Sequence, residues 1–471
     1  MAPTGKPKGA IRWRPLVSRL PADLAAAAVL ALYLVHALGR ASHGEIWDDA
    51  WFFHRIAHIW LKTGLPSWNP GEPPVHGNTS QLFQIVVTAL GAITRDYSVA
   101  LTKVFLTACL GGWYWLVSLR SPWLALAGLM SPLILLTGGT GMETALAIFL
   151  VGLFLHVSEI DVRGWSSGFL AVLLYWVRPD SVLIAAGLLA FQASERKSAA
   201  TRAGIASALG IGASLLLFRH LYGTAFPLSF HLKSLALSTY DSAYLQLGMR
   251  DKLHNVLMVA VCSAPFLAVC SRAWRRELPL LVSAALFFAY HLVFTHEIMG
   301  YHARFYAPGF AVLVFAAARA ATQKGGVLLE MRVSRVLWAG TALVLMTALS
   351  VQRQWIEGPR GFELSRMPLT TYLASLPAFL GPAAPFASAL AVGSLAAVGA
   401  IPLSLGFMSN REIAEAQVKH YRATPKVLEV EKCFGPTVSL AHSELGVLGI
   451  HFPDAHITDF SGLMNPDLAL G

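Results

Sequence analysis

Residues 98–118 read SVALTKVFLTACLGGWYWLVS, an apolar stretch whose only charged side chain is Lys103. A helix needs roughly 20 such residues to cross a hydrocarbon core about 30 Å thick. A bilayer offers no water to unpaired backbone groups, and the stretch lacks the alternating period of a barrel strand. It therefore predicts a transmembrane helix.

Similar apolar runs lie on both sides of this one. The further expected spans are residues 24–38, 122–138, 144–158, 165–177, 181–193, 203–218, 253–270, 278–295, 305–318 and 336–351, and the shorter segment 81–94 reads as a re-entrant or interfacial helix. The composition agrees: 55% of residues are hydrophobic and 13% charged, whereas soluble domains carry charge at about a quarter of positions. The sequence predicts an all-α polytopic membrane protein with about 11–13 transmembrane helices.

The basic residues indicate topology rather than nucleic acid binding. The net charge is +10, but Lys and Arg lie in short loops between apolar runs, not on one amphipathic face. We expect the first apolar run to be an uncleaved span with the basic leader before Leu24 in the cytoplasm. The positive-inside rule then places five basic clusters in the cytoplasm as well: Arg120, Arg163, 195–202, 272–276 and 319–335. The cysteines Cys109, Cys262, Cys270 and Cys433 are scattered and form no disulfide framework or zinc spacing.

In this layout the outer ends of the spans collect most of the remaining ionisable side chains. They are Asp48, Asp49, Glu72, Glu143, Arg178, Asp180, His231, Lys233, His296, Glu297, His302 and Arg304. Ionisable groups at membrane level are costly and mark functional sites by default. The alternative is an ordinary position in an interfacial loop, or, for the cations, snorkelling at the end of a span.

The first outer loop contains residues 44–74, GEIWDDAWFFHRIAHIWLKTGLPSWNPGEPP. Its adjacent carboxylates Asp48 and Asp49 repel each other, which suits a general base, and they also suit a divalent cation such as Mg²⁺, Mn²⁺ or Ca²⁺. The alternative is that they begin an amphipathic interfacial helix, where carboxylates favour the positive end of the dipole.

The loop resembles the first extracytoplasmic loop of the GT-C membrane glycosyltransferases, and most closely the terminal β-(1→2) arabinofuranosyltransferase family of mycobacterial cell walls. Its matches are the Asp pair, the aromatic-rich helix through Arg55, Gly64-Leu65, Asn69 to Glu72 and Gly77 to Ser80. Further stretches resemble the family's motifs in the same order: Gly139–Thr144, Arg178–Asp180, Tyr222–Lys233, His296–Pro308 and Ser443–Leu468.

The resemblance implies an enzyme that passes a sugar, such as arabinofuranose, from a polyprenyl-phosphate donor to a glycan or glycolipid acceptor. It places the active site on the outer face of a bacterial inner membrane. Asp48 or Asp49 would be the base, and a divalent cation at this pair is a candidate cofactor. Substrate would be bound by Glu143, Arg178, Asp180, His231, Lys233, Glu297, His302 and Arg304. Membrane lipids are partners and nucleic acid is not.

The chain divides into a cytoplasmic leader (1–23), a transmembrane catalytic domain (24–352, with the outer loop 39–80) and a C-terminal extracytoplasmic region (353–471). Residues 367–410 contain no charge but several prolines, so they form either one more span or part of a small outer α/β region. The resemblance favours the outer region. Residues 437–457 have the glycine and β-branched content of short strands.

Two other functions compete with the transferase. A secondary transporter or lipid-linked sugar flippase would also have about a dozen helices. However, transporters place their charges near the midplane and often in two repeated halves, and the pattern of residues 47–73 occurs once here. An inert scaffold that kept the fold is the other alternative.

Overall fold

Helices make up most of the residues that the computed structural model describes. The described residues are 16–38, 48–94, 99–131, 133–134, 141–233, 242–295, 301–322, 439–442, 449, 452–459 and 464–467. The expected span at 336–351, the apolar segment 367–410 and Cys433 lie outside them. The prediction of a mainly helical chain is confirmed for the described part.

The helices follow one another closely along the chain. They are α1 Leu16–Leu38, α2 Asp48–Thr63, α3 Gln81–Thr94, α4 Val99–Ser118, α5 Pro122–Leu129, α7 Thr144–Ile160, α8 Trp165–Val177, α9 Val182–Glu195, α10 Lys197–Tyr222, α11 Leu228–Lys233, α12 Ser242–Cys270, α13 Trp274–Phe294 and α14 Ala307–Ala321. Short 3-10 turns are η2 Pro179–Ser181, η3 Ser271–Ala273 and η4 Tyr301–Tyr306. Strands β1 Ser439–His442 and β2 His456–Asp459 pair in parallel, with Ser439 opposite His456.

Three of the described helices are long and apolar enough to cross a membrane by length and composition. They are α4, α10 and α13. Helices α3, α7 and α8 are apolar but have fewer than 18 residues. The expected span 122–138 differs most from the structure, because α5 ends at Leu129 with Met130 as its C-cap. Proline at position 132 disfavours helical geometry at the residue before it.

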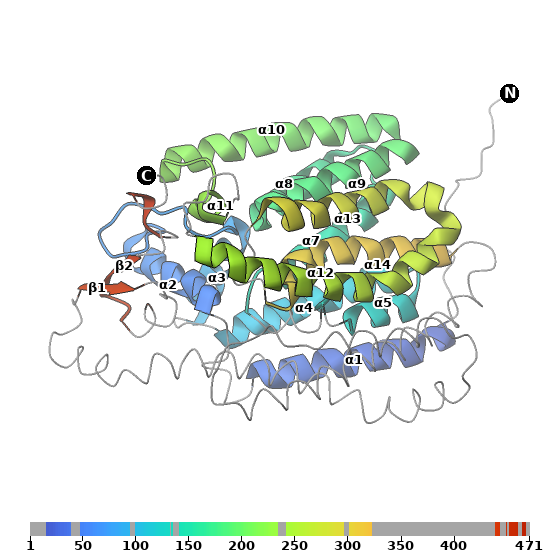
Figure 1. Ribbon diagram of the computed structural model, residues 1–471, viewed down its shortest axis with the longest axis horizontal. Coiled ribbons are helices and arrows are strands. Elements are labelled where there is room, and N and C mark those ends of the chain that lie inside the picture. Colours follow the sequence, from blue (N-terminus) through green and yellow to red (C-terminus); the bar gives the residue numbers. More distant parts are fainter. Residues whose placement is uncertain are drawn as a thin grey trace.

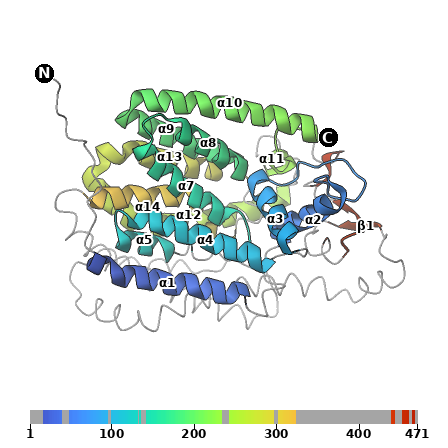
Figure 2. The same ribbon diagram turned by 180° about the vertical axis from the view of Figure 1, so that it is seen from behind.

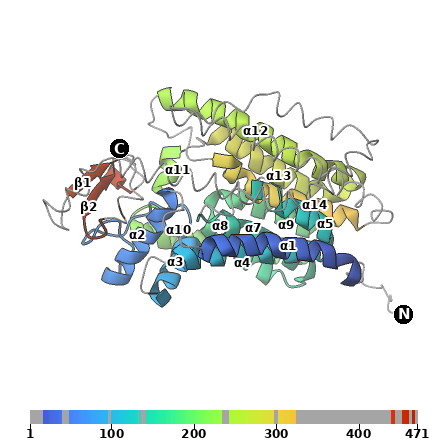
Figure 3. The same ribbon diagram turned by 90° about the horizontal axis from the view of Figure 1, so that it is seen from below.

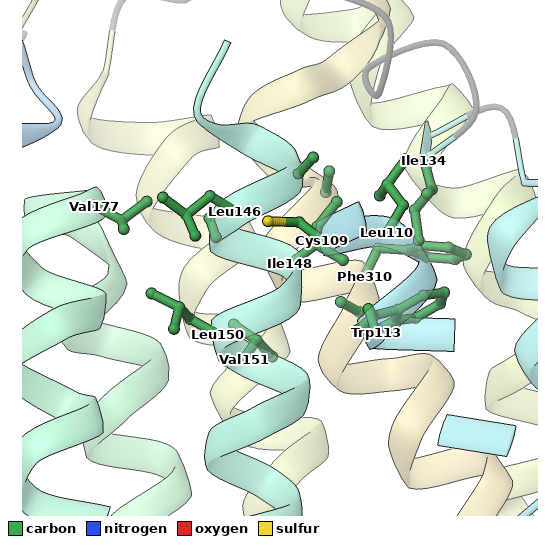
Figure 4. Packing of buried hydrophobic residues seen from close by; sticks show 14 of the residues in the cluster. Cys109, Leu110, Trp113, Ile134, Leu146, Ile148, Leu150, Val151, Val177 and Phe310 are labelled. Atoms are coloured by element: carbon green, nitrogen blue, oxygen red, sulfur yellow. The ribbon is translucent and has the colours of Figure 1, made fainter. Parts of the chain in front are cut away.

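The longer helices lie side by side in a bundle, with α10 along one edge and α1 along the opposite edge (Figures 1 and 2). Helix α7 packs against α4, α8 and α14. The core between them is apolar: Leu110, Trp113 and Ile148 are fully buried, and Figure 4 shows this packing. A close-packed core of this kind fixes the positions of the helix ends.

The two ends of the bundle differ in chemistry. Helices α2, α3 and α11 and the two strands gather at one end (Figures 1 and 3). Away from it, Arg319 near the end of α14 binds Glu159 Oε1 of α7 at 3.1 Å and Glu277 Oε2 of α13 at 3.2 Å. Arg120 also binds Glu159. Arg120 and Arg319, which belong to the expected basic clusters, thus form ion pairs with carboxylates where α7 and α14 end and α13 begins.

Arg55 joins the first outer loop to the C-terminal segment. Its guanidinium donates hydrogen bonds to four carbonyl oxygens, those of Trp68, Gly449, Phe452 and Ala455, at 2.7–3.0 Å. Gly449 allows this close approach, since a Cβ there would lie 2.6 Å from Arg55 Cδ. The tail and the first loop therefore form one unit.

Helix α2 is packed within the protein, and its expected position in the membrane interface stays a prediction. Its apolar face contacts α3, with Phe53 edge-on to Phe83 at 4.9 Å between ring centroids. Arg55 is fully buried although its side chain is charged. The reason is that carbonyl groups of the tail, distant in sequence, satisfy its donors.

Candidate functional site

A pocket of about 120 Å³ opens among the helix ends near α2. Its lining comes from the start of α2, the residues before α7, the turn between α8 and α9, α11, the end of α13, and η4. Among the described residues, the acidic, basic and histidine side chains of its lining are those of Asp49, Glu143, Arg178, Asp180, His291 and Arg304. Five of these six were candidates from the sequence.

Pro179 determines how Arg178 and Asp180 enter the pocket. A residue before proline is disfavoured in the helical region, and Arg178 is accordingly extended, at φ −154° and ψ 116°. Helix α8 therefore ends at Val177, and Pro179 begins the short turn η2. Asp180 then accepts hydrogen bonds from Arg178 Nε at 3.1 Å and Arg178 Nη2 at 2.6 Å. This two-pronged geometry fixes the guanidinium plane.

Glu143 occupies the N-cap position of α7 but makes no side-chain capping bond. Gly141, two residues earlier, has φ +77°, a conformation open mainly to glycine. The Glu143 side chain is 3% exposed, and its Oε1 lies 3.5 Å from Arg178 Nη1. The backbone of Glu143 thus begins α7, while its carboxylate lines the pocket.

Asp49 and Arg304 meet across the pocket although 255 positions separate them in the chain. Arg304 Nη2 donates to Asp49 Oδ2 at 3.0 Å. Arg304 is 2% exposed, so it does not snorkel to solvent. It follows Ala303, whose φ of +55° costs about 1–2 kcal/mol for a residue with a Cβ. Asp49, in the first turn of α2, is thereby held beside a fixed cation.

The ring of Phe305 lies between the two arginines. Arg178 Cζ and Arg304 Cζ are each 5.0 Å from its centroid, within the range of a cation–π interaction. The His291 ring stacks on it at 5.6 Å between centroids and 8° between planes. Two like charges are thus held near each other by one aromatic surface and by separate carboxylates.

His291 completes a buried ionic chain. Its Nε2 lies 2.9 Å from Asp180 Oδ2. Burial alone would raise the pKa of Asp180, but Arg178 and His291 lower it well below its ordinary value. Burial would lower the pKa of Arg178, yet Asp180 and Glu143 raise it above its usual range. Asp180 and Arg178 are therefore charged at neutral pH.

The charge of the pocket constrains what it binds. Three carboxylates (Asp49, Glu143, Asp180) face two guanidinium groups (Arg178, Arg304) in the described lining, which leaves one excess negative charge when His291 is neutral. Both cations already contact carboxylates. An anionic ligand must therefore bind an arginine beside a carboxylate that repels it, whereas neutral hydroxyl groups bind without that repulsion.

The other sequence candidates divide into two groups. His231 of α11 does not belong to the described lining. The side chains of Asp48, Lys233 and His302, and the whole of Glu297, lie outside the residues that the structure describes. Their part in the site stays a prediction.

Several lining residues were missed from the sequence, notably His291, Ser229 and Tyr290. His291 had a usable signal, because a histidine inside the apolar run 278–295 is an ionisable group at membrane depth. Ser229 lies within the stretch Tyr222–Lys233 that resembles a family motif, whereas Tyr290 had no such signal. They reach the pocket only through the way α11 and the end of α13 pack beside η4.

The expected divalent cation at Asp48 and Asp49 stays a prediction, because the side chain of Asp48 lies outside the described residues. No group of three or more His, Cys, Asp or Glu side chains there is arranged to hold a metal ion. Asp49 is paired with Arg304 instead. We derive no step through a metal.

Comparison of the chain with protein-family models, with curated proteins and with solved structures finds no significant match.

Proposed function

We propose that this chain is a membrane glycosyltransferase that moves a sugar from a polyprenyl-phosphate donor to a hydroxyl of a glycan or glycolipid acceptor. The sugar bond to the phosphate oxygen breaks and a bond from the anomeric carbon to the acceptor oxygen forms. The acceptor's proton passes to a carboxylate, Asp49 or its neighbour Asp48. The polyprenyl phosphate leaves with the bonding electron pair.

One observation carries the proposal: a base candidate and two buried cations line a single pocket. Asp49 lies 3.0 Å from Arg304, and Arg178 lines the same space. The departing phosphate gains negative charge as its bond to the sugar breaks, and fixed guanidinium groups stabilise that charge. Positioning the acceptor between base and leaving group makes the reaction effectively intramolecular.

The Asp49–Arg304 pair gives the donor a way to activate the base. Arg304 occupies one carboxylate oxygen of Asp49 through a hydrogen bond at 3.0 Å. The donor's phosphodiester carries one negative charge, the same as a carboxylate, and its two free oxygens match the same two-pronged geometry. When the donor phosphate binds Arg304, Asp49 is released to accept the acceptor's proton. Transfer would then depend on donor binding first.

The proposal includes a polytopic membrane location, with the pocket on the outer side of a bacterial inner membrane. The separation of the two ends supports it, because Arg120 and Arg319 lie away from the pocket, as the positive-inside rule requires. Arg55 also holds the tail against the first loop, so both belong to one compartment.

The position of the pocket favours a transferase over a transporter or flippase. Its lining residues come from helix ends and connecting turns. A transporter binds its substrate near the membrane midplane on interrupted helices. A site at one end suits a reaction between a lipid-anchored donor and an acceptor outside the bilayer.

Transfer of radiolabelled sugar tests the proposal. Purified full-length protein is incubated with polyprenyl-phosphate sugars and acceptor oligosaccharides, and Asp49→Asn and Asp48→Asn are compared with the wild type. We expect loss of at least about 100-fold in one of the two variants, since general bases contribute about 10²–10⁴-fold. The exposed pair Lys62–Asp454 provides the control Asp454→Asn. Equal rates in the wild type and both variants would exclude the carboxylate mechanism.

A further inference from the structure

Two buried polar atoms in the pocket lack partners. Glu143 Oε2 and Ser229 Oγ each have no hydrogen-bond partner within the described part of the chain. Glu143 is 3% and Ser229 4% exposed, and both line the pocket. A buried polar group without a partner costs about 1–3 kcal/mol, so a ligand in the pocket that supplies the missing hydrogen bonds is stabilised by these two atoms.

We propose that Glu143 and Ser229 form a subsite that recognises a hydroxyl group of the sugar carried by the donor. The inference rests on the proposed function and adds which part of the substrate Glu143 and Ser229 recognise. Glu143 lies before α7 and Ser229 lies on α11. A hydroxyl or a vicinal pair between them donates to Glu143 Oε2 and exchanges a hydrogen bond with Ser229 Oγ.

The chemistry of the two atoms favours a hydroxyl over other groups. An ionised carboxylate only accepts hydrogen bonds, whereas a serine hydroxyl both donates and accepts. Phosphate and carboxylate groups have no proton for Glu143 at neutral pH and are repelled by it. An ammonium group would lie near the guanidinium of Arg178, whose Nη1 is 3.5 Å from Glu143 Oε1. A neutral hydroxyl avoids both repulsions.

The remaining polar groups of the pocket fit a division into a phosphate site and a sugar site. Arg178 is fixed by Asp180 and stacked on Phe305, and Arg304 is paired with Asp49. The arginines therefore bind the phosphate, and Glu143 and Ser229 bind the sugar. A site that uses a buried hydrogen bond to select a hydroxyl discriminates strongly against analogues that lack it, because its own polar groups are then left unpaired.

Binding of short-chain donors to the purified full-length protein tests the subsite without requiring turnover. Farnesyl phosphate is compared with farnesyl-phosphoryl arabinofuranose, mannose and glucose, and the sugar bound most tightly is then used with single hydroxyls removed. Ser229→Ala deletes one hydroxyl. Ser263→Ala is the matched control, since Ser263 is 3% exposed and also unpartnered among the described residues but does not line the pocket.

We expect Ser229→Ala to weaken binding of the sugar-bearing lipid by about 3–10-fold and to leave farnesyl phosphate binding unchanged. One deoxy analogue should bind wild type and Ser229→Ala equally. Glu143→Gln should lower the affinity for the sugar-bearing lipid relative to that for farnesyl phosphate by at least about tenfold, because its hydrogen bond is charge-assisted. Ser263→Ala should match the wild type.

Four results would count against the inference or against the function on which it rests. If Ser229→Ala and Glu143→Gln weaken farnesyl phosphate and the sugar-bearing lipid equally, or if neither changes binding, the hydroxyl subsite is wrong while the proposed function stands. If no sugar improves binding over farnesyl phosphate, the subsite is again wrong. If the wild type binds none of these lipids, the proposed function itself fails.

Discussion

Arg178 is the residue on which the buried charges of the pocket depend most. It is the ion-pair partner of both Asp180 and Glu143. Arg178→Met keeps a similar volume but leaves two carboxylates without a cation, and removing one partner of a buried pair typically costs about 3–5 kcal/mol. We expect a large fall in the thermal unfolding midpoint. Adding Asp180→Asn to this variant should restore part of the loss, and a midpoint equal to the wild type in Arg178→Met would contradict the assignment.

Two buried histidines near the pocket should make stability depend on pH. His54 and His76 are 3% and 2% exposed, and burial lowers the pKa of each to about 4. Because the unfolded chain binds protons near pH 6.5 and the folded chain does not, stability is complete above pH 6.5 and falls as the pH decreases toward 4. Each histidine should cost about 1–2 kcal/mol between pH 6.5 and 5.

Unfolding midpoints measured from pH 7.5 to 5 check this dependence. The variant His76→Gln should show a shallower fall than the wild type, because it removes one of the two buried imidazoles. A flat profile for the wild type over this range would mean that the folded chain accommodates protonated His54 and His76.

At the residue scale, the sequence could identify ionisable side chains but not their partners. Asp49, Arg178 and Arg304 stand out because each adjoins an apolar run. The pairing of Arg304 with Asp49, and of His291 with Asp180, depends on how helices pack. No local pattern encodes that packing, because any cation at an outer end could satisfy any carboxylate there.

Helix α2 and the tail form the element that holds Asp49 in place. Arg55 donates to Gly449, Phe452 and Ala455 carbonyl groups of the tail, and Lys62 adds an exposed ion pair with Asp454 at 2.6 Å. Arg55→Met would leave these buried acceptors unpaired. It should destabilise the chain by at least about 3 kcal/mol, and backbone amides of residues 452–459 should exchange hydrogen faster.

The matched variant Lys62→Met separates the buried contact from the exposed one. Surface ion pairs contribute about 0–1 kcal/mol, so this variant should change the unfolding free energy and the exchange rates little. Similar effects of Lys62→Met and Arg55→Met would show that the tail is held by charge at the surface rather than by the buried guanidinium.

At the element scale, boundaries set by local chemistry were predictable and the others were not. The bounds of α8 agree with the expected 165–177, because Gly164 precedes it and Pro179 follows. Helix α10 extends beyond the expected 203–218 to Lys197–Tyr222, since charged side chains can occupy its ends without interrupting hydrogen bonding. The burial of Arg55 could not be predicted, because its acceptors lie almost 400 positions away.

For the whole molecule, the sequence predicted a helical bundle with different chemistry at its two ends. Charged residues in the connections divide between the pocket and the network around Arg319. Removing Arg319 and removing Arg178 would therefore act on separate ends, and only the second adjoins the pocket. The number of membrane crossings cannot be read from helix lengths alone, because α7 and α8 are shorter than a full span.

Photo-crosslinking with a prenyl phosphate that carries a diazirine on its first isoprene unit tests the central claim, that this pocket holds a lipid phosphate. The adjoining aromatic residues Phe230, Tyr290 and Phe305 should carry the label, and Arg304→Gln should reduce it by at least about tenfold, the loss expected for a charge-assisted contact. Labelling confined to the exposed outer face of α10, or labelling of the pocket that is unaffected by Arg304→Gln, would contradict the account.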